Sequence, residues 1–372
     1  MNVSDFDFDL PDDLIAQHPP AERGQSRLLV LGREAGTVAH TAFERLPEYL
    51  RRGDLLVLND TRVVPARLLG HRVPSGGAVE CLLIRQLPTP NAQRPTSQPT
   101  TSPSGPDLGV GRSEEWEALV HPGQKLKPGA EMLFERDGLR LHGDVLGRHF
   151  HGRRTIRLWT DEGEGEGVQA TIERIGHIPL PPYITRPDQP SDRERYQTVY
   201  ACESGSVAAP TAGLHFTPQL LDGLAAKGIE RATITLHVGY GTFKPVRVDQ
   251  VEEHEVDAER YTVAPAAADA LTRALGEGRR IIAVGTTTTR ALESLADEGT
   301  IAPATGETRL FIHPGHRFRL VSGLVTNFHL PRSSLLMLAA AFAGREPILS
   351  AYREAMAHRY RFYSYGDAML IL

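Results

Sequence analysis

The regular alternation of strand-like and helical segments after Ile175 constrains the fold of this chain more than any other feature. Residues 233–238 alternate polar and apolar side chains as a strand does, and residues 280–284 form a short apolar run typical of a buried strand. Between them, residues 266–275 have a helical pattern that Pro265 opens. Strands that alternate with helices favour parallel pairing in a sheet covered by helices. The sequence therefore predicts an α/β domain.

A different pattern lies between residues 67 and 161. No helical period of useful length occurs there, and Gly and Pro turns separate five short strand-like runs at residues 79–84, 116–120, 131–134, 139–145 and 155–159. Such a pattern predicts a small all-β domain, barrel-like, inserted into the larger α/β domain.

We therefore expect an α/β fold class, with a large mixed α/β domain and a smaller inserted barrel-like domain. The expected boundaries are 1–66 for the first part of the α/β domain, 67–168 for the barrel and 169–372 for the second part. Residues 87–113 form a Pro/Ser/Thr-rich tract with almost no apolar side chains, so it cannot repay the entropy of its own ordering. We expect this tract to be a mobile surface loop.

Composition is that of a soluble globular protein, with 40% hydrophobic and 23% charged residues in 372. The acidic N-terminal segment lacks the positive and apolar regions of an export signal, so we expect a cytoplasmic protein. The apolar run at residues 335–343 is far shorter than the ~20 residues that cross a bilayer, and indicates a buried helix. Cys81 and Cys202 fall in different predicted domains and are too few to bind zinc by themselves, so we expect two free thiols.

The charge balance bears on possible partners. Forty-six acidic residues against forty-one basic ones give a net charge of −5, which is not typical of a general nucleic-acid-binding protein. A local basic patch can still bind a polyanion, because counterion release depends on the phosphates that are neutralised. No coiled-coil pattern argues for an oligomer, so we expect a monomer.

Candidate site residues concentrate between Gly205 and Val246. A loop that carries Thr211, Gly213 and His215 follows the apolar, strand-like run 207–209, and Thr217 then caps a helix that begins at Pro218. His237 lies at the end of the returning strand. The two histidines could face a common pocket, since ligands of α/β sheets bind at strand ends. Structural histidines also occupy such positions, and both interpretations stay open here.

Three further loops place polar side chains directly after predicted buried strands. They are the segments Asn59-Asp60-Thr61-Arg62, Gly285 to Arg290 with its four threonines, and Thr326, Asn327 and His329. Each has a bland alternative, because Asn and Asp stabilise turns and threonines cap helices. The Gly-Thr loop lacks the lysine and the spacing of a nucleoside-triphosphate loop, so ligand contact through hydroxyls and backbone N–H groups is the remaining functional interpretation.

The C-terminal segment, residues 352–365, interleaves arginines with aromatic rings. Such a pattern suits stacking on unpaired bases, and docking of a terminal helix by its aromatic side chains would look the same.

Several long motifs resemble one known family. The motifs are GSVAAPTAGLHFT, TLHVGYGTFKPV, TNFHLPRSSLLMLAAAFAG, YRFYSYGDAMLIL, GDLLVLNDTRVVPARL and IGHIPLPPYITR. They are similar, in the right order, to those of the S-adenosylmethionine:tRNA ribosyltransferase-isomerases of queuosine biosynthesis. The resemblance covers most of the chain apart from about residues 70–168. It implies an α/β protein with an inserted β domain, and a transferase that moves and isomerises the ribosyl group of S-adenosylmethionine. The implied acceptor is 7-aminomethyl-7-deazaguanine in a tRNA anticodon, the products are epoxyqueuosine, adenine and methionine, and no metal is implied.

The resemblance also implies roles for the candidate residues. Such chemistry needs a base beside the sulfonium and an acid or hydrogen-bond donor for the departing adenine. The implied proton-transfer candidates are His215, His237, His329 and Asp60. Substrate binding would involve Arg62, Thr211, Gly213, Arg290 and Asn327, with the arginines on the methionyl carboxylate or a tRNA phosphate. The tRNA candidates are Arg359, Arg361 and Tyr363. A methyltransferase and a non-catalytic RNA-binding module are the rival interpretations.

Overall fold

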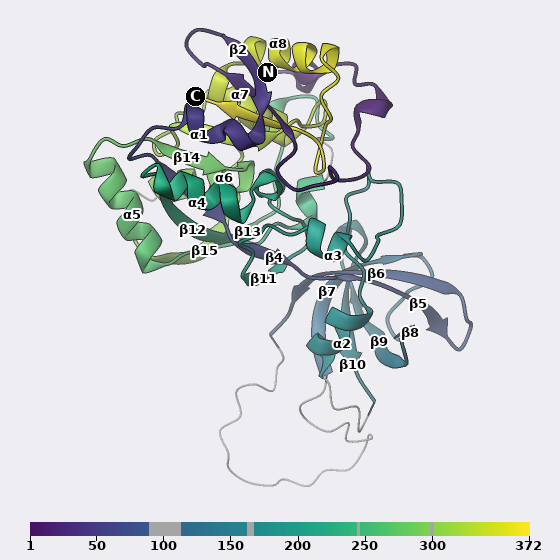
Figure 1. Ribbon diagram of the computed structural model, residues 1–372. Helices are drawn as coiled ribbons and strands as arrows, with labels where there is room; N and C mark the ends of the chain where they lie inside the picture. Colours follow the sequence, from purple (N-terminus) through teal and green to yellow (C-terminus); the bar gives the residue numbers. More distant parts are fainter. Residues whose placement is uncertain (89–112, 162–166, 244–245, 298–300) are drawn as a thin grey trace. The chain divides into compact units, whose positions relative to one another are not determined.

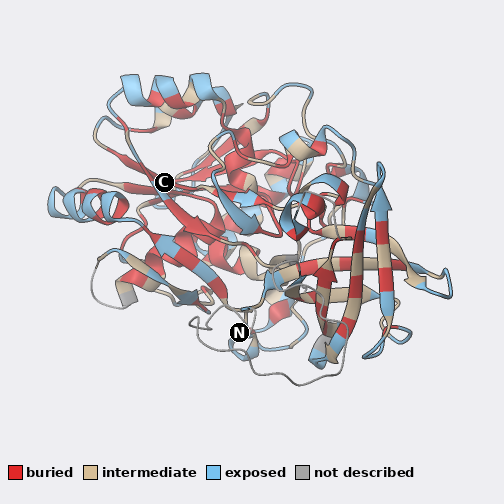
Figure 2. Cartoon of the chain, turned by 90° about the horizontal axis from the view of Figure 1, so that it is seen from below, coloured by how far each residue is buried: buried red, intermediate tan, exposed pale blue. Residues whose placement is uncertain are grey.

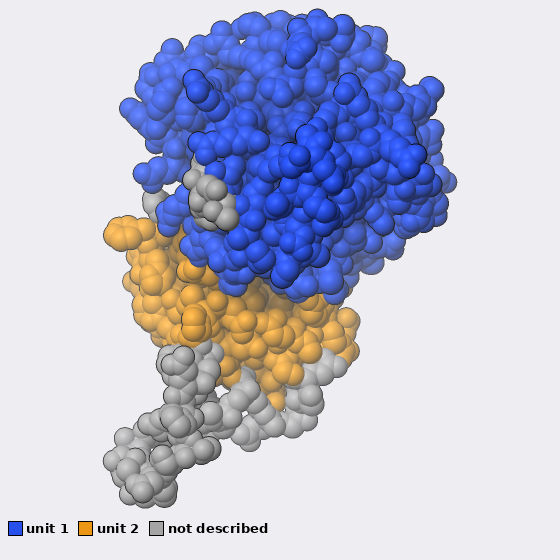
Figure 3. All heavy atoms as spheres, turned by 90° about the vertical axis from the view of Figure 1, so that its left-hand side faces the viewer, with its two compact units in different colours: residues 1–63, 180–372 blue, residues 64–179 orange. Residues whose placement is uncertain are grey.

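The computed structural model describes residues 1–88, 113–161, 167–243, 246–297 and 301–372 (Figure 1). The predicted mobile tract, residues 87–113, lies almost wholly outside these ranges. The chain forms two compact units, shown in separate colours in Figure 3: Met1–Val63 with Leu180–Leu372, and Val64–Pro179. The predicted boundary after residue 168 differs from this division because helix α2 (Val168–Ile175) buries Ile172 and Ile175 among the apolar side chains of the barrel.

The first unit is built on a nine-stranded mixed sheet, with the strand order β15-β13-β12-β3-β14-β16-β17-β1-β2. From one edge to the other these strands are Ala304–Thr308, Glu259–Val263, Glu230–Leu236, Leu55–Asn59, Ile281–Val284, Gly323–Asn327, Ala368–Ile371, Arg27–Leu31 and Val38–Ala42. The four central strands, β12, β3, β14 and β16, are mutually parallel, as the alternation of strands and helices predicts. Their carboxyl ends consequently meet at one edge of the sheet. The outer strands β13, β15 and β2 pair antiparallel, as β17 does with β16.

Helices cover both faces of this sheet. Successive side chains of a strand point to opposite faces, so an apolar strand presents apolar side chains to the helices on each side. On β3, Leu55 and Val57 pack into one apolar cluster, and Leu56 and Leu58 pack into another. The helices of the unit include α1 (Leu46–Tyr49), α3 (Asp192–Arg195), α4 (Pro218–Ala226), α5 (Pro265–Gly276), α6 (Thr286–Asp297), α7 (Ser334–Ala343) and α8 (Arg345–Ala357). Figure 2 shows the central strands coloured as buried.

Local signals in the sequence account for several helix boundaries. The hydroxyl of Thr217 accepts a hydrogen bond from the backbone N–H of Leu220 at 3.1 Å, and Pro218 is the first residue of α4, as predicted. The predicted apolar helix is also confirmed as α7, which is buried. Among the described residues no single helix is long and apolar enough to span a bilayer; α7 and α8 meet that length and composition only together, bent by 114°.

One strand prediction in this unit is wrong. The run 207–209 is buried but is not a strand, because the strand there is β11 (Glu203–Ser206), which pairs parallel with β4 (Thr61–Val63). The backbone N–H groups of Val207 and Ala208 both turn to the carbonyl of Val238 instead of to a neighbouring strand.

The second unit is a closed antiparallel barrel, which confirms the predicted barrel-like domain. Its order is β10-β7-β6-β5-β8-β9, closed by pairing of β9 with β10. In that order the strands are Arg153–Trp159, Ser113–His121, Ala78–Gln86, Arg67–Val73, Glu131–Arg136 and Leu139–Arg148. Strand β5 was not predicted, since only Leu68 of its side chains is fully buried and its sequence lacks a clear apolar run. Cys81 is buried in this unit and Cys202 is exposed in the other, so both thiols are free as predicted.

Candidate active site

A cavity opens where the central parallel strands end. The segments that follow β14 and β16 line it, together with Val238, which follows β12. Its empty volume is about 1010 Å³ including the open mouth. The lining residues are Tyr183, Ala208, Ala209, Pro210, Thr211, Ala212, Val238, Thr242, Gly285, Thr286, Thr287, Thr326, Asn327, Phe328, His329, Leu330, Pro331, Ser333, Leu335, Tyr363 and Ser364. This is the position at which open α/β sheets bind ligands.

The described residues that line the cavity carry no formal charge. Among the described residues that line it there is no Asp, Glu, Lys or Arg, and its polar groups are hydroxyls, the amide of Asn327 and the imidazole of His329. Apolar walls with a few polar groups are typical of small-molecule sites. The rings of Tyr183 and Tyr363 lie side by side with centroids 4.5 Å apart. A cationic ligand could therefore be stabilised by aromatic faces in place of a carboxylate.

Of the three candidate histidines, His329 is the one that lines the cavity. Its Nε2 lies 2.7 Å from the hydroxyl of Thr326, and its backbone N–H donates to the hydroxyl of Tyr352 at 2.9 Å. Both partners are buried, so the imidazole is fixed by Thr326 and the backbone of the same residue by Tyr352. Burial lowers the pKa of His329 to about 3. The side chain is consequently a neutral imidazole at physiological pH.

His215 lies behind the cavity wall and contacts it through Asn327. Its Nδ1 lies 2.8 Å from the hydroxyl of Ser26, and its Nε2 lies 3.3 Å from Oδ1 of Asn327. The amide nitrogen of Asn327 donates to the carbonyl of Tyr363, so Oδ1 accepts and Nε2 of His215 donates. Burial lowers the pKa of His215 to about 4. The geometry favours a role in orienting Asn327, which itself lines the cavity.

These two buried histidines predict an acid-sensitive fold. Their folded pKa values, about 4 and about 3, lie below the ordinary value of 6.5, so the unfolded chain binds more protons below pH 6.5. The contribution of the two histidines to the free energy of unfolding should thus be fully present above pH 6.5. It should fall as the pH falls toward 4, by up to about 1.4 kcal/mol per pH unit for each histidine.

Urea unfolding between pH 7 and 5 measures this slope. His215→Gln should lower it by up to about 1.4 kcal/mol per pH unit. An equal slope in wild type and His215→Gln would contradict the assignment.

His237 and Asp60 belong to a second polar group, which follows the carboxyl end of β3. Nδ1 of His237 lies 2.9 Å from the hydroxyl of Thr61, and the carboxylate of Asp60 accepts a hydrogen bond from Thr235 at 2.7 Å. Burial lowers the pKa of His237 and raises that of Asp60. The cavity lining includes neither residue, so the structure does not bring His237 and His215 to one common pocket.

Gly205 is required beside His237. It has a φ of +145°, and a Cβ there would lie 2.9 Å from Cε1 of the imidazole. Any side chain at position 205 would therefore displace the ring of His237.

In the Gly-Thr loop, two threonines are structural and the other two line the cavity. The hydroxyls of Thr288 and Thr289 donate to the carbonyls of Val284 and Gly285 within the first turn of α6 and are buried, as structural threonines are. Thr286 and Thr287 line the cavity, at the amino end of a twelve-residue helix. This end of α6 can offer hydroxyls and backbone N–H groups to a ligand.

Arg290 and Arg62 both lie away from the cavity lining. Arg290 is buried, its Nη1 lies 2.5 Å from a carboxylate oxygen of Glu259, and its Nε donates to the carbonyl of Leu310. Arg62 is exposed on β4, and its side chain makes no ion pair with any described residue.

Of the candidates for substrate binding that remain, Thr211 and Gly213, only the first lines the cavity. Thr211 lines the cavity, but Gly213 is buried beneath Tyr200 and Thr198, where an added Cβ would collide with both side chains. Asn59, the neighbour of Asp60, bonds to the backbone of Leu236 and Thr61, as the turn interpretation expects, and its Nδ2 also lies 3.5 Å from the hydroxyl of Thr287 in the cavity lining.

The C-terminal aromatic residues are part of the core. Tyr352, Tyr360, Phe362, Tyr363 and Tyr365 are all buried, the arrangement that the docking interpretation describes. Tyr363 lines the cavity and is only 4% exposed, so its ring does not lie on the outer surface, where a tRNA base could stack.

The two arginine candidates for tRNA contact do reach the surface. Arg359 is exposed and pairs with the exposed Asp13 at 2.7 Å, and Arg361 is half-buried.

Tyr183 lines the cavity but was not among the candidates from the sequence, and the same holds for Thr242 and Ser364. Tyr183 comes from the segment just after the barrel, and its hydroxyl bonds to Ser364 at 2.6 Å. Its only signal was its place in the motif IGHIPLPPYITR.

Comparisons with known proteins agree on one family. The family model described as "Queuosine biosynthesis protein" matches residues 3–371. The S-adenosylmethionine:tRNA ribosyltransferase-isomerases of Symbiobacterium thermophilum and Desulfitobacterium hafniense are 51% and 48% identical to this chain, each over 374 residues and 100% of both proteins. The crystal structure of an S-adenosylmethionine tRNA ribosyltransferase from Thermotoga maritima is similar with a TM-score of 0.53 and 38% identity, covering 99% of this chain and 100% of that one.

Proposed function

The chain belongs to the S-adenosylmethionine:tRNA ribosyltransferase-isomerase family of queuosine biosynthesis, and from that premise we propose the reaction and the residues that carry it out. The enzyme transfers and isomerises the ribosyl group of S-adenosylmethionine onto 7-aminomethyl-7-deazaguanine in the tRNA anticodon. Epoxyqueuosine forms, and adenine and methionine leave. The full-length match to relatives of that name carries this proposal.

The cavity at the carboxyl ends of the central strands is the proposed site for S-adenosylmethionine. Its uncharged wall suits a ligand that brings both a cation and a carboxylate of its own. The aromatic faces of Tyr183 and Tyr363 would stabilise the sulfonium, since a cation is attracted to the face of a ring. The amino end of α6, at Thr286 and Thr287, would hold the carboxylate in place of Arg290, whose charge is paired with Glu259.

Proton transfer falls to His329 in this proposal. The sulfonium acidifies the neighbouring C–H bonds, so a neutral imidazole is a sufficient base, and His329 is neutral and lines the cavity. Asn327, oriented by His215, and Thr211 would position the nucleoside through hydrogen bonds. His237 and Asp60 remain candidates for contact with the acceptor base, beside the exposed Arg62.

Analysis of the spent S-adenosylmethionine tests the reaction. Purified enzyme with precursor-bearing tRNA should release free adenine and methionine, which chromatography resolves. Release of S-adenosylhomocysteine would show a methyltransferase instead. Consumption of S-adenosylmethionine only when the tRNA is present would exclude a non-catalytic RNA-binding module. The monomeric state and the cytoplasmic location stay predictions.

Arg359 and Arg361 are the proposed contacts to tRNA phosphates. Replacing both with alanine should weaken tRNA binding and lower the slope of log K against log salt by about 2, one for each phosphate that is no longer neutralised. Binding of S-adenosylmethionine should not change, because neither arginine lines the cavity.

Titrations of tRNA at several salt concentrations measure this slope, with Arg345→Ala as the matched surface control. An unchanged slope in the double variant would place the tRNA elsewhere on the protein.

A further inference from the structure

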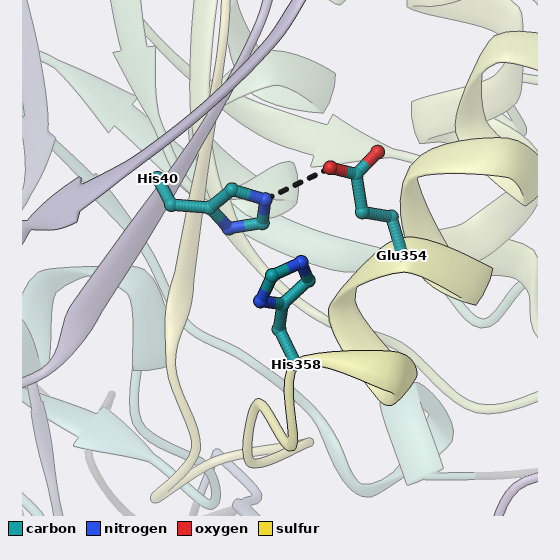
Figure 4. A group of neighbouring side chains, drawn as sticks. All are labelled: His40, Glu354 and His358. Carbon is teal, nitrogen blue, oxygen red and sulfur yellow. Dashed lines mark hydrogen bonds and ion pairs between the residues drawn. The ribbon is translucent and has the colours of Figure 1, made fainter.

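A cluster of metal-ligand side chains lies outside the cavity, at the edge of the nine-stranded sheet. His40 comes from the edge strand β2, Glu354 from the last turn of α8, and His358 from the residue that ends α8. Glu354 and His358 are four residues apart and so share one face of the helix. Figure 4 shows the three side chains converging, with the ion pair between His40 and Glu354 marked.

The distances suit a single ion. One ligand atom from each residue lies within 4.8 Å of the other two. Zinc binds nitrogen and oxygen at about 2.0 to 2.2 Å, so ligands on one ion lie up to about 4 Å apart. The side chains of His358 and Glu354 are at the surface and can make the small movement required. None of the three residues lines the cavity.

A buried hydroxyl supports the first ligand from behind. Nδ1 of His40 lies 2.9 Å from the hydroxyl of Tyr360, which is itself 3.5 Å from the carbonyl of Leu28. When Nδ1–H donates to this hydroxyl, the lone pair of Nε2 faces the carboxylate of Glu354 at 2.9 Å. Two acceptors at that distance require a cation between them, either a proton or a metal ion. Metal-bound histidines are commonly oriented in this way through their second nitrogen.

The third side chain distinguishes this cluster from an ordinary ion pair. The rings of His358 and His40 lie with centroids 4.4 Å apart, and the ring nitrogens of His358 have no hydrogen-bond partner among the described residues. The nearby guanidinium of Arg27, which lies over the ring of Tyr360, is neutralised by Asp367 at 2.8 Å. It therefore opposes a bound cation only weakly.

We propose that His40, Glu354 and His358 bind one divalent transition-metal ion, with water in the remaining positions. Two imidazoles and one carboxylate favour Zn²⁺, Ni²⁺ or Cu²⁺ over Mg²⁺ or Ca²⁺. The ion would link edge strand β2 to the end of α8, whose next residues include the proposed tRNA contacts Arg359 and Arg361.

Titration of untagged, chelator-treated enzyme with Zn²⁺ tests the site. We expect calorimetry to show one Zn²⁺ per chain and thermal melting to shift upward, with no shift on adding Mg²⁺. His40→Ala and His358→Ala should each weaken binding by about tenfold or more, and Tyr360→Phe should weaken it by about tenfold through its effect on His40. The exposed His358 keeps the test valid if His40→Ala unfolds.

Two controls identify other sources of binding. His142→Ala removes a histidine that pairs with a carboxylate but belongs to no group of three metal-ligand side chains among the described residues, and Cys202→Ser removes the exposed thiol. Neither change should affect the stoichiometry or the affinity. Zn²⁺ binding that survives both His40→Ala and His358→Ala, or that is lost only in Cys202→Ser, would overturn the proposal, as would the absence of saturable binding.

Discussion

Replacing His329 with alanine should lower turnover at least about a hundredfold, the usual contribution of a general acid or base. We expect this loss because His329 is the one candidate histidine that lines the cavity. Its imidazole bonds to Thr326, and its backbone N–H donates to the hydroxyl of Tyr352. Its removal also leaves the buried hydroxyl of Thr326 without a partner, at a cost of about 1 to 3 kcal/mol.

A matched variant separates the chemical effect from the structural one. Thr326→Val breaks the same hydrogen bond but keeps the imidazole, so it should lose similar stability and only about tenfold in turnover. Steady-state turnover and melting are measured side by side for both variants. Because the pKa of His329 is about 3, the pH profile of the wild type should show no loss of activity from this group between pH 5 and 8.

His237→Ala and His215→Ala extend the comparison. His215→Ala should act through Asn327, raising the KM for S-adenosylmethionine more than it lowers kcat. Near-normal turnover in His329→Ala, with a large loss in His237→Ala, would transfer the base to the second polar group, where Asp60 is the alternative.

Much of this architecture was predictable because its signals are local. Pro218 and Thr217 mark the start of α4, and the positions of Asn327 and His329 at the end of a buried strand follow from the order of apolar runs. Parallel central strands then bring those ends together without any knowledge of the contacts.

The parts that were not predictable depend on contacts between distant residues. His215 bonds to Ser26 across 189 positions, and Tyr183 enters the cavity from just beyond the barrel. Nothing near Arg290 in the sequence indicates that Glu259 forms an ion pair with it. The periodicity of a segment reports which face is buried, but it does not identify the partner of a polar side chain.

The pair Arg290 and Glu259 predicts the largest effect on stability. Both side chains are buried, at 8% and 4% exposure, and one carboxylate oxygen of Glu259 also accepts hydrogen bonds from Gly239 and Thr242 at 3.1 Å. Glu259→Gln would leave the guanidinium buried without a counter-charge, so it should destabilise the α/β unit by about 3 to 5 kcal/mol.

The unfolding of each unit can be followed separately. Both tryptophans, Trp116 and Trp159, lie in the barrel, whereas the long helices α4 to α8 lie in the other unit. Urea unfolding followed by helical circular dichroism should therefore shift in Glu259→Gln while the tryptophan fluorescence transition stays near its wild-type position.

The double variant Arg290→Met with Glu259→Met tests whether Arg290 binds the substrate. Replacing a buried ion pair by apolar side chains is often nearly neutral, so the double variant should be more stable than Glu259→Gln alone. If Arg290 only neutralises Glu259, the refolded double variant should bind S-adenosylmethionine within about tenfold of the wild-type affinity. The remaining loss would come from Thr242 in the cavity wall, which no longer has the carboxylate of Glu259 as its hydrogen-bond acceptor. A loss of about a hundredfold or more in a stable double variant would instead show that Arg290 contacts the methionyl carboxylate, and that the amino end of α6 cannot bind it alone.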